Sequence, residues 1–145
     1  MGLDMRLLAQ KYVSEFNEPQ YASIGGTFKQ PPPGPIFEVT TEAMSWRKAN
    51  AIHAWFVKNV QGGVDECQRV PVSREQLQCL HHDCIAVTAN HSLAGTLLPP
   101  VDGFFFGSLE QDWYFFKTVA DTADRIGELL SGKYDSWHFY YEGSW

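Results

Sequence analysis

Patterns typical of β-strands occur near both ends of this chain, and helical patterns fill the space between them. Leu3 to Val13 alternates loosely between apolar and polar residues, and Ile36 to Thr41 alternates and is rich in β-branched residues. Trp137 to Tyr141 also alternates and predicts a last strand running nearly to Trp145. Strands gathered at the two ends predict an α+β fold, most simply a mainly antiparallel sheet packed against about three helices.

Three segments between these strands show helical periodicity. The first runs from about Trp46 to Val60, with Gly62-Gly63 as its stop. The second begins at Ser73, which is expected to form a capping box with Gln76. Its apolar residues at helical spacing are Leu77, Leu80, Cys84 and Val87.

The third helix is predicted to open at Ser108, which with Gln111 has the pattern of a second capping box, and to run to about Leu130. Its buried stripe is expected to contain Phe116, Val119, Ala123, Ile126 and Leu130.

The chain is expected to form one domain over residues 1–145, because this length suffices to bury a sizeable core. Residues 17–35 contain Gly25-Gly26 and the run Pro31-Pro32-Pro33-Gly34. Neither a helix nor a central strand accommodates such a run, so we predict a Pro/Gly-rich excursion over the surface there.

The formal net charge of −6 argues against a duplex-DNA binder, which needs a basic face to displace counterions. No apolar stretch approaches the ~20 residues of a membrane span, and the N-terminal residues do not have the pattern of a signal peptide. Cys67, Cys79 and Cys84 form an odd set, which is expected to be reduced in a cytoplasm.

Neither a cofactor nor a metal site is predicted. The run His81-His82-Asp83-Cys84 lacks zinc-ligand spacing, because adjacent residues on a helix diverge by about 100°. No nucleophile arrangement or phosphate-binding loop is recognisable, so catalysis is uncertain and non-covalent binding is favoured.

The start of the first predicted helix gives the strongest functional indication. Arg47 and Lys48 fall in its first turn, where the helix dipole disfavours cations by a few tenths to ~1 kcal/mol. An anion held by the free N–H groups and the two side chains would offset this cost. Trp46, His53 and Trp55 would supply flat surfaces for a base or sugar. In the alternative interpretation, Trp46 and His53 pack inward and both cations are solvated.

The turn Gly103 to Ser108 is a second candidate region. Its three consecutive phenylalanines cannot all face one way, and we assign Phe105 to the ligand-binding side. Glu110 and Asp112 follow in the first turn of the third predicted helix and would repel an anion. A hydrophobic corner that fixes the third helix is the simpler interpretation of this turn.

Several of these strings together resemble a family of small bacteriophage-encoded proteins, and the resemblance spans nearly the whole chain. The strings are Met1-Gly2-Leu3-Asp4-Met5, Trp46-Arg47-Lys48, His53-Ala54-Trp55-Phe56, Ser73 to Leu77, Gly103 to Ser108, and Ser144-Trp145. The resemblance implies a phage protein acting in the host bacterial cytoplasm, and it implies no particular reaction.

We therefore expect a phage protein that counters host immunity by sequestering an anionic nucleotide-like signal, with a homo-oligomer as a possible state. The alternative is an acidic inhibitor that covers the basic surface of a host defence protein, as anti-CRISPR proteins do. A nucleotide-acting enzyme is the third and least favoured class. Trp145 is expected to be tied down against the sheet or a neighbouring subunit.

Overall fold

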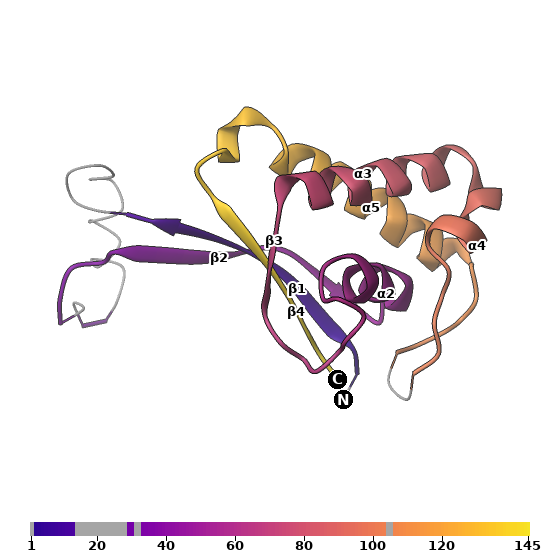
Figure 1. Cartoon of the computed structure of the whole chain (residues 1–145), viewed down its shortest axis with the longest axis horizontal. Helices are drawn as coiled ribbons and strands as arrows, with labels where there is room; N and C mark the ends of the chain where they lie inside the picture. Colours follow the sequence, from indigo (N-terminus) through magenta and orange to yellow (C-terminus); the bar gives the residue numbers. More distant parts are fainter. Residues whose placement is uncertain (1, 14–28, 31–32, 104–105) are drawn as a thin grey trace.

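The computed structural model describes residues 2–13, 29–30, 33–103 and 106–145 (Figure 1). This part of the chain contains a four-stranded antiparallel sheet and four α-helices, which confirms the α+β prediction. The strand order is β2-β1-β4-β3. The strands are β1 (Asp4–Tyr12), β2 (Glu38–Arg47), β3 (Val70–Val72) and β4 (His138–Ser144). The helices are α2 (Asn50–Asn59), α3 (Arg74–Ala89), α4 (Ala94–Leu97) and α5 (Trp113–Leu129), with 3-10 turns η2 (His91–Leu93) and η3 (Gly132–Tyr134).

β1 lies inside the sheet, paired with β2 on one side and β4 on the other. Its apolar residues explain this position, because Met5 and Leu7 are fully buried in the core, as is Leu3 just before the strand. The pairing of Asp4 with Ser144 brings the two ends of the described chain side by side, as Figure 1 shows.

The helices pack on the sheet and on each other around one core. Phe56 of α2 stacks on Tyr141 of β4, with ring centroids 3.9 Å apart. α3 and α5 lie side by side in Figure 1. The predicted apolar stripe of α3 is confirmed, since its four residues are all buried, and so is the capping box of Ser73 and Gln76.

The predicted start of the first helix was wrong. Trp46 and Arg47 belong to β2, because the ladder with β1 continues to the pair Asp4–Arg47. The Lys48 N–H then bonds to the Leu3 carbonyl at 2.7 Å, and Lys48 turns the chain with a φ of +55°. α2 begins only at Asn50.

The start of the third predicted helix was also wrong. α5 begins at Trp113, and Asp112 is its N-cap, accepting the Phe115 N–H at 3.0 Å. Ser108 accepts instead from the Glu110 N–H in the connector before the helix. Within α5, Val119, Ala123 and Ile126 are buried as expected, and the remaining two stripe residues, Phe116 and Leu130, are half-buried.

The short strand β3, helix α4 and both 3-10 turns were not predicted. β3 has only three residues, which is too short for a periodic signal, and it exists because it pairs with β4. Most of the predicted surface excursion at residues 17–35 lies outside the described residues; Lys29, Gln30, Pro33 and Gly34 within it are exposed.

Candidate functional site

A cavity of about 200 Å³ lies where the start of α2, the connector before α5 and the first turns of α5 meet. We call it the α2 cavity. It joins two regions singled out in the sequence, namely the Lys48 region and the end of the Gly103–Ser108 turn. Its lining residues are Lys48, Ala49, Asn50, Ala51, Ile52, Gly107, Ser108, Glu110, Asp112, Tyr114, Phe115, Thr118 and Val119.

Asn50 fixes the wall of the α2 cavity, and its buried side chain is fully used in doing so. Its amide nitrogen donates to the carbonyl oxygens of Phe106 and Ser108, at 3.0 and 2.8 Å. Its amide oxygen accepts the Val101 N–H at 3.0 Å. The first residue of α2 thus holds the connector against the helix start.

Gly107 allows the connector to approach Lys48 closely. Gly107 has a φ of +89°, in the region that favours glycine. A Cβ atom there would lie 3.0 Å from the Lys48 Cβ and 3.3 Å from the Lys48 carbonyl oxygen. A larger residue would therefore displace Lys48 from the edge of the cavity.

The first residues of α2 line the cavity. The N-cap residue, Ala49, has no side chain that can accept from the first turn, and the first turn contains no acidic residue. The first N–H groups of a helix have no partner within it, and the helix dipole makes this end attractive to anions. The exposed Lys48 precedes it and adds a positive charge.

Two carboxylates limit how much negative charge the α2 cavity accepts. Asp112 is engaged as the cap of α5, and Glu110 is exposed in the connector. Together they outweigh the charge of Lys48, so a cluster of phosphates is disfavoured, and an anionic group is favoured only next to Lys48 and the start of α2. Tyr114 and Phe115 supply the aromatic wall.

The aromatic residues predicted to flank an anion, Trp46, His53 and Trp55, are buried, and none of them lines the α2 cavity. Trp46 donates its indole N–H to the Thr122 hydroxyl at 2.8 Å inside the core. Trp55 donates to Asp83 at 2.9 Å, and His53 is 1% exposed. The inward-packing alternative therefore holds for Trp46 and His53.

The remaining residues predicted for the site are Arg47, Lys48 and Phe105, and they lie in different places. Arg47 is exposed and lies 3.7 Å from the Asp4 carboxylate, outside the α2 cavity but beside a second groove described below. Lys48 lines the α2 cavity as described. Phe105 lies outside the described residues.

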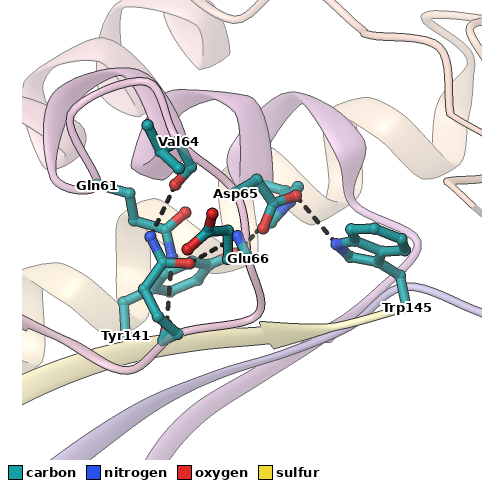
Figure 2. Close-up of polar contacts among 8 residues, drawn as sticks. Gln61, Val64, Asp65, Glu66, Tyr141 and Trp145 are labelled. Atoms are coloured by element: carbon teal, nitrogen blue, oxygen red, sulfur yellow. Dashed lines mark hydrogen bonds and ion pairs between the residues drawn. The ribbon is translucent and has the colours of Figure 1, made fainter.

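A chain of hydrogen bonds through His53 was not predicted from the sequence. His53 Nδ1 lies 2.6 Å from the Tyr141 hydroxyl, and Nε2 lies 2.7 Å from Asp65 Oδ2. The Trp145 indole donates to the same Asp65 oxygen at 3.0 Å, and Figure 2 shows this carboxylate facing the indole. Trp145 is thus attached to the loop after α2, although 52% of it remains exposed.

Burial and a neighbouring carboxylate determine the state of two groups in this series of hydrogen bonds, the Tyr141 hydroxyl and the His53 Nε2. Burial, with the nearby Asp65 charge as a second cause, raises the pKa of Tyr141, so its hydroxyl is neutral. An ionised Asp65 carboxylate has no hydrogen to donate, so it accepts a hydrogen bond from the Nε2–H group of His53. Because Tyr141 is fully buried, its hydroxyl has no path to a substrate, and the chain serves to join α2, β4 and the Asp65 loop.

The three cysteines are free thiols, with Cys67 and Cys79 exposed and Cys84 buried. Burial, assisted by the Asp83 charge, raises the pKa of Cys84 to about 12. Among the described residues, no group of three or more His, Cys, Asp or Glu side chains is placed to hold a metal ion.

No helix in the described ranges is both long enough and apolar enough to cross a membrane. The chain matches no protein-family model, no curated protein and no solved structure at a significant level.

Proposed function

We propose that this protein binds a small anionic, nucleotide-like molecule non-covalently in the α2 cavity. The proposal rests on the residues that line the α2 cavity. The uncapped start of α2 and Lys48 can attract an anion, and Tyr114 and Phe115 can contact a planar group.

The proposed role is sequestration of an immune signal in the cytoplasm of a bacterial host. This role combines the chemistry of the cavity with the resemblance of the sequence to a phage-encoded family. A protein that only captures a signal needs affinity and abundance but no turnover, which agrees with a binding site of this kind.

A different observation favours inhibition of a host protein as the second candidate. Leu109, Trp113 and Tyr114 are large apolar residues that lie close together in the chain and are more than half exposed. Exposed aromatic residues on an acidic domain suit a partner with a basic surface.

One experiment separates these functions. The protein is incubated with a panel of mononucleotides and dinucleotides, the free ligand is measured, and the protein is then heat-denatured and the supernatant analysed. Recovery of an intact nucleotide that had been depleted supports sequestration. An altered nucleotide indicates an enzyme, and the absence of any depletion removes the nucleotide proposal and favours a protein target.

Lys48→Asn tests the assignment of the site. Asn tolerates the positive φ at this position and removes the charge. Loss of a charge-assisted hydrogen bond, worth ~1.5–3 kcal/mol, is expected to weaken binding about ten- to hundredfold by isothermal titration calorimetry. Lys133→Asn in η3, outside the cavity, is the matched control and is expected to bind as the wild type. Equal affinity of both variants would remove the α2 cavity as the site.

A further inference from the structure

A second groove lies directly beside the α2 cavity, between the end of β2 and the first turns of α5. Its volume is about 300 Å³, and we call it the β2–α5 groove. Its lining includes Arg47, Trp113, Tyr114, Lys117 and Asp121.

The two cavities share a wall. Tyr114 and Thr118 line both of them, so the α2 cavity and the β2–α5 groove lie on either side of these neighbouring α5 residues. The Tyr114 hydroxyl also reaches the Arg47 carbonyl oxygen, at 3.5 Å, and so sits at the junction of β2 and α5. A single ligand passing over Tyr114 can therefore occupy both spaces.

Like the α2 cavity, the β2–α5 groove is lined by an aromatic residue and a cation. Trp113 is 75% exposed, and it offers a flat surface on which a base can stack. Among the described residues, the Arg47 guanidinium has one ion-pair partner, Asp4 at 3.7 Å, and both side chains are more than half exposed. Such a pair is weak, so the guanidinium is free to turn toward an anion in the groove.

Size and charge restrict the ligand further. Ligand pockets usually measure about 300–1,000 Å³, so the α2 cavity alone is small and the two together fall within the range. The cations Arg47, Lys48 and Lys117 are balanced by nearby carboxylates, which argues against a polyphosphate or a long nucleic acid. A ligand with two planar groups and few charged groups fits both the combined volume and the balance of charges.

We infer that the α2 cavity and the β2–α5 groove form one bipartite site for a dinucleotide, with one nucleotide unit on each side of Tyr114. This inference rests on the proposed function and specifies its ligand class. Lys48 acts on the unit in the α2 cavity, while Trp113 and Arg47 act on the second unit.

The test compares ligands that fill one or both halves. Isothermal titration calorimetry is performed with AMP and GMP, with the corresponding diadenylate and diguanylate, and with a single-stranded hexanucleotide. At least one dinucleotide is expected to bind about tenfold or more tightly than its mononucleotide, since it adds a stacked base and an ion contact. The hexanucleotide is expected to gain nothing further.

Trp113→Ala isolates the second half of the site. It is expected to remove the advantage of the dinucleotide over its mononucleotide, whereas Lys48→Asn weakens the binding of both ligands. Trp145→Ala, which truncates another exposed tryptophan outside both cavities, is the control and is expected to keep the advantage. Circular dichroism checks that each variant melts as a folded protein.

The outcomes separate this inference from the proposed function. Mononucleotide binding with no gain for any dinucleotide overturns the bipartite site and leaves the proposed function standing. A dinucleotide advantage that survives Trp113→Ala also overturns it, as does a hexanucleotide that binds more tightly than the dinucleotides. If none of the probes binds, the proposed function itself fails.

Discussion

Trp46 shows at the scale of one residue why an aromatic side chain beside two cations need not belong to a binding site. Its ring packs near Phe56, at 5.9 Å between centroids, and its single polar atom is satisfied by Thr122 inside the core. A tryptophan can be buried this deeply when its N–H finds a partner.

Thr122→Val tests this role of Trp46. The substitution keeps the side-chain shape but leaves the buried Trp46 N–H without its acceptor, so the free energy of unfolding should fall by ~1–3 kcal/mol. Chemical denaturation monitored by circular dichroism measures the loss. Thr118→Val, one turn earlier and half-buried, is the control and should change stability less. Equal stability of the wild type and Thr122→Val would show that the indole bond is dispensable.

At the scale of elements, local signals predicted α3 well. Ser73 accepts the Gln76 N–H at 3.0 Å, and the Gln76 side chain accepts the Ser73 N–H at 2.9 Å. This reciprocal cap depends only on residues three apart, and for that reason the sequence alone was sufficient.

The contribution of this cap can be measured. Ser73→Ala should lower the free energy of unfolding by ~1 kcal/mol, the usual value of an N-cap. Because the two side chains act together, Ser73→Ala and Gln76→Ala should be less than additive in a double-mutant cycle. Additive losses in chemical denaturation would mean that the two hydrogen bonds are energetically independent.

Features that depend on distant partners could not be predicted. Trp46 and His53 fall on one face of a helical pattern, but the pairing with β1 extends β2 through Arg47 and delays the helix. The His53–Tyr141 contact joins residues 88 apart in sequence, and nothing local to either residue indicates the other. Among the residues that line the α2 cavity, Lys48 and Ser108 lie in segments that the sequence singles out. Trp113 of the β2–α5 groove was not singled out, because the third helix was predicted to begin at Ser108 rather than at Trp113.

At the scale of the whole molecule, Glu142 of β4 links three segments of the sheet. Its carboxylate pairs with Arg6 of β1 and, at 2.8 Å, with Arg69 just before β3. The hydrogen bond from Arg69, with the charges of both arginines, lowers the pKa of Glu142 below its ordinary value. The contribution of this network to stability is therefore present above the unfolded-state pKa of about 4.3 and is lost as pH falls through the lower folded-state pKa.

Glu142→Gln should make the loss of stability in acid shallower than in the wild type, because one carboxylate no longer takes up a proton on unfolding. Thermal melts between about pH 2.5 and 7 follow this change. Glu42→Gln provides the control, since Glu42 is exposed on β2 and makes no ion pair with the described residues. Parallel pH profiles of wild type and Glu142→Gln would contradict the link.

The position of β1 between β2 and β4 has a consequence for how the protein is made. Synthesis on the ribosome delivers β1 and β2 before β4, the other neighbour of β1, which is the last of the four described strands to leave the exit tunnel. Throughout that interval one edge of β1 has no strand beside it, and its apolar side chains lack much of their final cover. We therefore expect the nascent chain to be bound by chaperones that recognise exposed apolar strands until residue 144 has emerged and the four-stranded sheet can form.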